Sequence, residues 1–307
     1  MNKVPIVIAF TENYFVSAST FLTSLLKNSD DTNSFHVICL LTDVLPERLE
    51  YKLTKLGGSR CTFEFINLMG KLDGIYVNPR YTIAASYRLL LPEILPQYDK
   101  ILYMDCDIIV QQDMAKLYND TSVEGYYLAA VFEAVLEHQI AYIKQLGCNP
   151  HYYFNSGVLI FNLQKMRANN MTDKFIDASK KEGLQFPDQD VLNQLCQGHV
   201  IGLSPLYNSI RTYFIPSYRS QFIRRYDEKI WIKLQEHSNI HYTGNKPWIS
   251  FTVKFGTWWK YYNMLPAEIK QEGQISILYY YISLIYNNPL GNYFINGLQA
   301  MLRKFKS

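Results

Sequence analysis

The chain has 307 residues, 48% of them hydrophobic, and a formal net charge of +3. This hydrophobic content excludes an intrinsically disordered or collagen-like chain, and the near balance of 30 basic and 27 acidic residues argues against a dedicated nucleic-acid-binding protein. Five widely spaced cysteines without a CxxC pair argue against a disulfide scaffold and a structural zinc site, and they favour a reducing compartment. The apolar stretch Ile6–Phe10 is too short for a signal sequence or a membrane span, so we expect a cytoplasmic protein.

The first third of the chain alternates short apolar runs with helical patterns. Strands are predicted at Val4–Phe10, Phe35–Leu41, Cys61–Ile66 and Ile101–Met104. Helices are predicted at Tyr14–Lys27, Pro46–Leu56 and Ile83–Leu91, the last of them closed by Pro92. This alternation predicts an α/β fold with a mostly parallel central sheet that helices flank. Ligands of such sheets bind beyond the carboxyl ends of the strands, so we expect the site there.

Farther along the chain the pattern is looser. Strands are predicted at Tyr126–Val131, Gly157–Phe161 and Ile240–Tyr242, and helices at Met171–Lys181 and Asp188–Cys196. No Gly/Ser-rich linker occurs before Glu272. We therefore predict one domain over residues 1–272 and a C-terminal helical appendage over residues 273–307.

The strongest local signal for chemistry is the pair Asp105 and Asp107, which directly follows the strand Ile101–Met104. In an extended backbone residues i and i+2 point the same way, so both carboxylates should leave the sheet together. Carboxylate oxygens favour Mg²⁺ or Mn²⁺, ions that commonly bridge to substrate phosphates. We predict a metal site here rather than a solvated turn, and an unreactive thiol at Cys106, since the flanking acids raise its pKa.

A second acidic pair, Asp188 and Asp190, opens a predicted helix. Asp188 suits the N-cap position, and on a helix residues i and i+2 do not share a face. We therefore expect that these two carboxylates do not bind one metal ion together. A capping role is at least as well supported as a functional one.

His241 follows the apolar Ile240 and is soon followed by Gly244 and Lys246. An imidazole, a glycine that lets backbone approach a ligand, and a lysine together suit a pyrophosphate bound to a metal. Taken alone, His241 is better explained as a hydrogen-bonded histidine at the end of a strand, so the prediction rests on all three residues.

The order of these motifs resembles glycosyltransferase family 8. The segments that carry the resemblance are Ile6–Tyr14, Ser86–Leu90, Asp105–Asp107, Tyr153–Gly157, Asp188–Asp190 and His241–Trp248. The chain looks most like bacterial lipopolysaccharide and capsule galactosyl- and glucosyltransferases. The resemblance implies a GT-A fold, a Mn²⁺-dependent site that Mg²⁺ could also serve, a UDP-hexose donor and retention of the anomeric configuration.

The resemblance also implies roles for individual residues. The metal ligands would be Asp105, Asp107 and His241. The nucleotide-sugar would be held at the uridine by Ala9, Thr11 and Tyr14, at the diphosphate by Gly244 and Lys246, and at the sugar by Arg88, Asn155, Asp188 and Gln189, with Cys106 in the same set. The catalytic residues would be Gln189, Asp188 and Arg88.

The chemistry of the reaction supports these roles. Breaking the bond between the anomeric carbon and UDP develops negative charge on the diphosphate, which a divalent ion and Lys246 would stabilise. The anomeric centre becomes cationic, and Gln189 and Asp188 are the candidates to face it. Because the sequence indicates no carboxylate pair at the separation of a retaining hydrolase, we favour front-face transfer over a covalent intermediate on the weakly nucleophilic Gln189.

Two other function classes fit the sequence less well. A nucleotidyltransferase that makes sugar nucleotides should have a Gly-rich, basic loop after its first strand, and Thr11–Phe15 contains neither glycine nor a basic residue. A non-catalytic carbohydrate-binding module would explain the 15% aromatic residues but not an Asp–Asp–His set. The acceptor, and the choice between galactose and glucose, stay open.

The C-terminal residues 273–307 suggest a membrane role. Ile275–Tyr286 is too short and too rich in tyrosine to span a bilayer, but tyrosines suit the headgroup boundary. No acidic residue follows Glu272, whereas Arg303, Lys304 and Lys306 would attract anionic lipids. We expect this segment to attach the enzyme to the inner face of the cell membrane, near a lipid-linked saccharide acceptor. The alternative is an ordinary helix packed on the domain.

Overall fold

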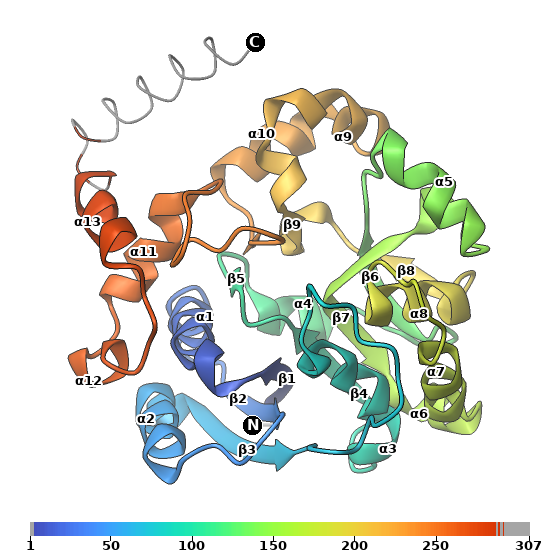
Figure 1. The fold of residues 1–307 in the computed structure, drawn as a ribbon, viewed down its shortest axis with the longest axis horizontal. Coiled ribbons are helices and arrows are strands. Elements are labelled where there is room, and N and C mark those ends of the chain that lie inside the picture. The colour runs from blue at the N-terminus through green and yellow to red at the C-terminus, as the bar shows by residue number, and fades with distance from the viewer. Residues whose placement is uncertain (1–2, 287, 289–290, 292–307) are drawn as a thin grey trace.

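The main sheet organises the fold. In this computed structural model, which describes residues 3–286, 288 and 291, the described strands of the main sheet have the order β3-β2-β1-β4-β7-β6-β8 (Figure 1). The strands are β1 (Val4–Phe10), β2 (Phe35–Leu41), β3 (Cys61–Asn67), β4 (Lys100–Met104), β6 (Leu128–Phe132), β7 (Phe154–Asn162) and β8 (Val200–Gly202). Neighbouring strands are parallel except where β7 pairs antiparallel with β4 and β6. The predicted α/β fold with a mostly parallel sheet is confirmed.

Successive residues of β1 serve two different cores. Ile6, Ile8 and Phe10 belong to the core on one face of the sheet, and Val7 and Ala9 belong to the core on the other. This follows from the period of two in an extended backbone. Because both faces are covered, β1 is a continuous apolar run, as is typical of a parallel sheet.

Helices cover both faces of the sheet. The long helices and their short companions are α1 (Phe15–Lys27), α2 (Glu47–Gly57), α3 (Leu91–Ile94), α4 (Met114–Asp120), α5 (Glu137–Gln145), α6 (Leu163–Ala168), α7 (Met171–Ser179), α8 (Pro187–Cys196), α9 (Arg219–Arg225), α10 (Glu228–Glu236), α11 (Phe255–Asn263), α12 (Ala267–Lys270) and α13 (Ile277–Tyr286). The predicted helix Ile83–Leu91 is wrong in detail: Ile83–Leu90 is a 3₁₀ helix that continues directly into α3. Pro92 lies in the first turn of α3, where its missing N–H has no partner to lose, and so it does not end the helix.

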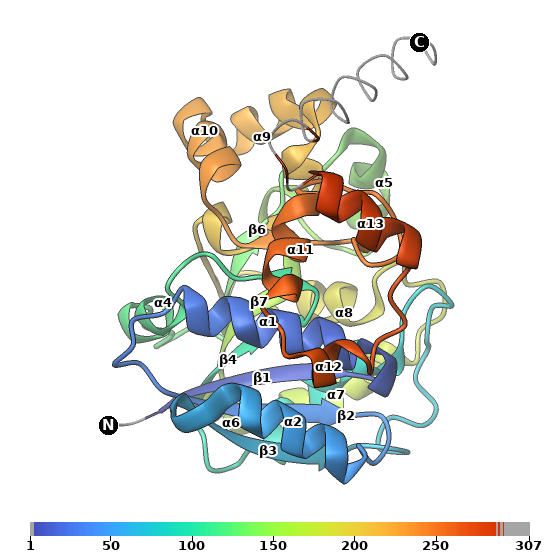
Figure 2. The same ribbon diagram turned by 90° about the vertical axis from the view of Figure 1, so that its left-hand side faces the viewer.

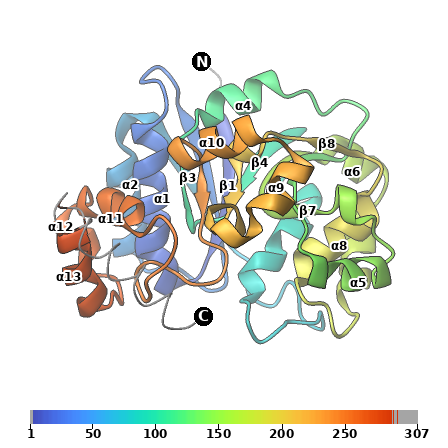
Figure 3. The ribbon, with the colours of Figure 1, turned by 90° about the horizontal axis from the view of Figure 1, so that it is seen from above.

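A small second sheet stands beside the carboxyl ends of the main strands. It consists of β5 (Ile108–Ile109), β10 (Ile240–His241) and β9 (Ser209–Ile210), in that order among the described residues. Viewed from above, α9 and α10 lie between α11–α13 on one side and α5 and α8 on the other (Figure 3). This sheet joins the residues after β4 to residues more than a hundred positions later in the chain.

The residues after Glu272 include a helix that packs on the domain. Tyr279 and Tyr286 of α13 contact Phe255 of α11 at ring distances of 6.2 and 5.8 Å, and α11–α13 lie together beside α1 (Figure 2). Tyr279, Tyr280 and Tyr286 are thus turned toward the domain rather than toward a headgroup layer. No helix in residues 3–286 is both long enough and apolar enough to cross a membrane. Arg303, Lys304 and Lys306 lie outside the described residues.

Candidate functional site

A cavity of about 510 Å³ opens where β1 and β4 end. β6 runs parallel to β4, and β7 runs the opposite way, so the end of β6 and the start of β7 meet at this same edge. The sequence predicts a site beyond the carboxyl ends of the strands, and the cavity lies there. All the residues to which the family resemblance gives a role line this cavity: Ala9, Thr11, Tyr14, Arg88, Asp105, Cys106, Asp107, Asn155, Asp188, Gln189, His241, Gly244 and Lys246.

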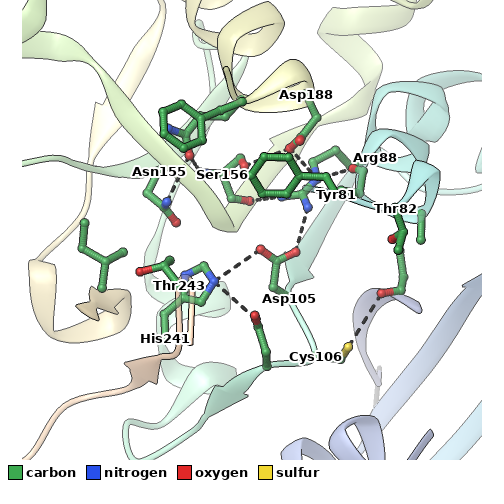
Figure 4. A pocket seen from close by; sticks show the side chains of 18 of the residues that line it. Tyr81, Thr82, Arg88, Asp105, Cys106, Asn155, Ser156, Asp188, His241 and Thr243 are labelled. Atoms are coloured by element: carbon green, nitrogen blue, oxygen red, sulfur yellow. Dashed lines mark hydrogen bonds and ion pairs between the residues drawn. The ribbon is translucent and has the colours of Figure 1, made fainter. Parts of the chain in front are cut away.

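Asp105, Asp107 and His241 form a cluster in the lining of this cavity. Figure 4 shows Asp105 and His241 turned toward each other. One ligand atom from each residue lies within 4.8 Å of the others, and Nε2 of His241 is 3.6 Å from Asp105 Oδ2 and 3.3 Å from Asp107 Oδ1. The antiparallel pairing of β5 with β10 places His241 opposite Ile108 and therefore beside Asp107. The two carboxylates converge on His241 as predicted, but not through an extended backbone: β4 ends at Met104, and Cys106 and Asp107 lie in a turn before β5.

The chemistry of this cluster fits a divalent cation. Oδ1 of Asp107 is buried and has no hydrogen-bond partner, which is costly for a carboxylate unless a cation binds there. Two carboxylates and an imidazole form a ligand set suited to Mn²⁺ or Mg²⁺. The cluster could therefore hold the metal ion that the sequence predicts.

Lys246 contacts the other oxygen of Asp107. Its Nζ forms an ion pair with Asp107 Oδ2 and donates a hydrogen bond to the carbonyl of Tyr242 at 2.8 Å. Burial opposes ionisation of Asp107, but Lys246 and His241 together outweigh it and hold the pKa of this carboxyl well below its usual range. Gly244, with φ of +86°, lets the chain turn between His241 and Lys246.

Arg88 lies beneath the cavity and is only 2% exposed. Its guanidinium pairs with Asp105 at 2.7 Å and with Asp188 at 3.2 Å, and it lies over the ring of Tyr103 at 4.2 Å. Burial alone would lower the pKa of Arg88, but the two carboxylates raise it, so its charge is permanent. Arg88 therefore joins the metal-site aspartate to the start of α8.

The start of α8 differs from the sequence prediction in one respect. Phe186, not Asp188, is the N-cap residue, because Pro187 occupies the first turn and the helix begins earlier than predicted. The Asp188 carboxylate is instead buried, where it accepts a hydrogen bond from Ser156 Oγ at 2.9 Å and pairs with Arg88. Asp190 points elsewhere and accepts a hydrogen bond from Tyr153, so the prediction that these carboxylates diverge is confirmed.

The side chain of Gln189 is held on all sides. Its Oε1 accepts hydrogen bonds from Asn155 Nδ2 at 3.0 Å and from the Ser156 backbone N–H at 3.1 Å. Its Nε2 donates to Tyr153 Oη at 3.1 Å and to Glu133 Oε1 at 3.3 Å. A primary amide has two donor hydrogens and an oxygen with two lone pairs, so the protein satisfies this group completely.

Another part of the cavity is formed by residues at the end of β1 and just after it. Tyr14 lines the cavity beside Thr11 and Ala9, and its ring meets the buried Trp248 edge to face at a ring distance of 5.7 Å. The Cys106 thiol lies 3.8 Å from the carbonyl of Ala9, and burial together with Asp107 and Asp105 raises its pKa well above the usual value. The predicted unreactive thiol is in agreement with this environment.

Glu133 in the cavity and Asn208 beside His241 are among the residues that the sequence analysis does not identify. Glu133 lines the cavity and is buried, and burial raises its pKa to about 7. A signal for it existed, because it directly follows the apolar run of β6 just as Asp105 follows β4. Asn208, fully buried beside His241, gave no comparable signal, since it lies in an irregular segment before β9.

Comparison with known proteins agrees with this geometry. Residues 5–252 match the model of glycosyl transferase family 8. A lipopolysaccharide 1,2-glucosyltransferase of Escherichia coli K12 is 30% identical over 254 residues, which cover 78% of this chain and 71% of the relative. A putative glycosyltransferase of Haemophilus influenzae is 25% identical over 283 residues, or 83% of this chain and 81% of the relative. The galactosyltransferase LgtC, solved in complex with donor and acceptor sugar analogs, aligns with a TM-score of 0.71 and 25% identity over 88% of this chain and 100% of the other.

Proposed function

The chain belongs to glycosyltransferase family 8 and is a glycosyltransferase with a GT-A fold, and on this premise we propose that it moves galactose or glucose from a UDP-sugar to a hydroxyl of a saccharide acceptor, with retention of the anomeric configuration. The observation that carries the proposal is the cluster of Asp105, Asp107 and His241 inside a single cavity. Relatives named as lipopolysaccharide glucosyltransferases support a role in cell-surface polysaccharide synthesis.

Different residues of the cavity suit the base and the diphosphate of a UDP-sugar. The ring of Tyr14, which lines the cavity and packs against Trp248, suits a uracil base. Asp105, Asp107 and His241 would hold Mn²⁺, which when bound would offset negative charge on the diphosphate. Lys246, whose partner Asp107 is one of the metal ligands, is close enough to serve the same diphosphate.

The sugar would lie toward Arg88, Asp188 and Gln189. The charge of Asp188 is directed toward Arg88 and Ser156, and both lone pairs of the Gln189 oxygen are used by Asn155 and Ser156. An amide oxygen that already accepts two hydrogen bonds is a poor nucleophile, and this supports front-face transfer over a covalent intermediate on Gln189. In this mechanism the bond from the anomeric carbon to the diphosphate oxygen breaks, the acceptor oxygen bonds to that carbon on the same face, and the departing phosphate oxygen takes the acceptor's proton.

We test the donor and the metal with a panel of UDP-sugars. Hydrolysis and thermal stabilisation are measured for UDP-galactose, UDP-glucose and other UDP-hexoses, each with and without Mn²⁺. Stabilisation and turnover by UDP-galactose or UDP-glucose only when Mn²⁺ is present are expected. Stabilisation by all of these sugars without a metal ion would contradict the proposed donor site.

We propose further that the C-terminal residues 273–307 hold the enzyme on the inner face of the cell membrane. Although one side of α13 packs on the domain, five of its apolar side chains are exposed: Ile277, Leu278, Tyr281, Leu284 and Ile285. They share one face because they are spaced at the helical period. The exposed Ile249 is close by, since the backbone N–H of Ser276 donates to the carbonyl of Trp248 at 3.0 Å. These exposed side chains support an apolar face on α13, close to the segment His241–Trp248 that carries Gly244 and Lys246.

Co-sedimentation with liposomes tests this attachment. The double variant Leu278→Glu/Ile285→Glu should lose binding to anionic vesicles, whereas Ile232→Glu, at an exposed apolar position of α10, should keep it. High salt should weaken the binding of the unmodified chain, because basic residues contribute. Equal sedimentation of both variants would remove α13 from the attachment.

A further inference from the structure

A continuous path of side-chain hydrogen bonds runs beneath the cavity from α8 to the candidate metal site. Its members, in order of contact, are Asp190, Tyr153, Gln189, Asn155, Asn208 and His241. The first and last members are far apart in the sequence, and both are buried. Because each group can donate or accept only in certain ways, the direction of every bond along the path can be worked out.

The direction is set first at the α8 end. Tyr153 donates its hydroxyl hydrogen to Asp190 Oδ1 at 2.6 Å, so its oxygen is the acceptor for Gln189 Nε2. The Gln189 oxygen then faces the opposite way, toward Asn155 Nδ2. The Ser156 backbone N–H, which can only donate, requires the same orientation.

Asn155 and Asn208 carry this direction to the histidine. Since Asn155 donates to Gln189, its Oδ1 is left to accept, and it does so from the Gly157 N–H at 3.0 Å and from Asn208 Nδ2 at 2.8 Å. The Asn208 oxygen therefore faces Nδ1 of His241, 2.9 Å away. An amide oxygen only accepts, so Nδ1 of His241 must carry the hydrogen.

We propose that Asn208 is a positioning residue that fixes the Nδ1–H tautomer of His241 and turns the lone pair of Nε2 toward Asp105 and Asp107. The inference rests on the proposed metal site, for which Nε2 lies 3.6 and 3.3 Å from the two carboxylates. A hydrogen bond to the second nitrogen is the usual means of orienting a metal-binding histidine. The same path of hydrogen bonds also orients Gln189. One network therefore fixes the orientation of both a proposed metal ligand and a residue proposed to lie beside the donor sugar.

The tautomer can be observed directly in the unmodified chain. Long-range ¹H–¹⁵N correlation spectra of the metal-free protein, with the His241→Gln spectrum used to identify the signals, should show the hydrogen on Nδ1 and none on Nε2. A hydrogen on Nε2, in the other tautomer or in the doubly protonated ring, would overturn the proposal. This readout depends neither on the donor nor on activity.

Binding of Mn²⁺ tests the consequence of the tautomer. In the presence of UDP, Asn208→Leu should weaken Mn²⁺ binding, measured by the electron paramagnetic resonance of free Mn²⁺, by about 10- to 100-fold. Asn208→Asp keeps an oxygen that accepts from Nδ1–H, and it should retain the affinity. The control is Ser209→Ala, because this neighbouring side chain is equally buried but bonds only to the Pro205 carbonyl.

The outcomes separate the two proposals. Equal Mn²⁺ affinity of Asn208→Leu and Ser209→Ala would overturn the role of Asn208. Failure of the unmodified chain to bind Mn²⁺ would instead contradict the proposed metal site, and the tautomer spectrum would still decide whether Asn208 orients His241.

Discussion

The ring of His241 lies directly against Gly157. A Cβ atom built on Gly157 would be 2.3 Å from Cε1 and 2.6 Å from Nδ1 of the imidazole, which is closer than non-bonded atoms can approach. Gly157 lies in β7, in the middle of the main sheet, so its backbone cannot easily retreat. The absence of a side chain at position 157 is therefore what allows the histidine to reach the two aspartates.

We expect Gly157→Ala to displace the His241 ring and to lower Mn²⁺ affinity and turnover by about 10-fold or more. The matched control is Gly202→Ala in β8, where a Cβ would lie 2.8 Å from the ring of Phe132, away from the metal site. Both variants should lose stability, but only Gly157→Ala should lose metal affinity in a Mn²⁺ titration. The same affinity in both variants would show that the histidine does not need this space.

Asp105→Asn and Asp107→Asn should each reduce Mn²⁺-dependent turnover of the UDP-sugar by about 100-fold or more, because a metal ion contributes several kcal/mol to such a reaction. The fold should persist, since Arg88 keeps Asp188 and Lys246 keeps the Tyr242 carbonyl as partners. Circular dichroism and initial rates check both points. Asp177→Asn, at an exposed position of α7, is the control, and near-normal rates in either active-site variant would refute the metal assignment.

Gln189→Ala should slow turnover by about 100-fold but leave measurable activity, because the residue is expected to stabilise charge and not to form a bond. Its oxygen already accepts two hydrogen bonds from the protein. Mass spectrometry of the unmodified enzyme during turnover should find no hexosyl group on residue 189. A trapped adduct at that position would contradict front-face transfer.

Asp190→Asn should leave Mn²⁺ affinity unchanged, since Asp190 does not contact the metal cluster and the Ser156 and Gly157 N–H groups still orient Gln189 and Asn155. It should nevertheless destabilise the fold by about 1–3 kcal/mol, because Asp190 is buried and accepts hydrogen bonds from Tyr142, Tyr153 and the Phe186 N–H. Chemical denaturation and metal titration measure the two effects. A loss of metal affinity without a loss of stability would be the opposite of this expectation.

Glu133→Gln should stabilise the protein more at high than at low pH. Burial raises the pKa of Glu133 from 4.5 to about 7, so the folded state binds a proton more tightly than the unfolded state, and its stability falls as the pH rises between these values. Gln at this position carries no charge and removes that penalty, by up to about 3 kcal/mol above pH 7. The free energy of unfolding of both proteins is measured at about pH 5 and about pH 8. An equal stabilisation by Gln at both pH values would contradict a raised pKa of Glu133.

The amino-acid sequence alone determines the features that depend on residues close together in the chain, which are the strands, the helices and the directions of neighbouring side chains. The alternation of apolar runs and helical patterns is local, so it predicts the strands of the main sheet to within a few residues, except the short edge strand β8. Asp105 and Asp107 are recognisable because they directly follow an apolar strand, although a turn at Cys106 and Asp107, and not the predicted extended backbone, brings their carboxylates together. The helical period correctly separates Asp188 from Asp190.

Only the tertiary structure decided which distant residues meet these local groups. His241 reaches Asp107 through the pairing of β5 with β10, and Asn208 reaches His241 from a segment without regular secondary structure. The prediction that Asp188 caps α8 is wrong, because its partner Arg88 lies a hundred positions away in the sequence and forms a buried ion pair with it. The helix begins earlier, with Phe186 at the N-cap and Pro187 in the first turn. Local sequence specifies backbone direction, whereas the hydrogen bonds of a buried polar group depend on which chain segments the fold brings together.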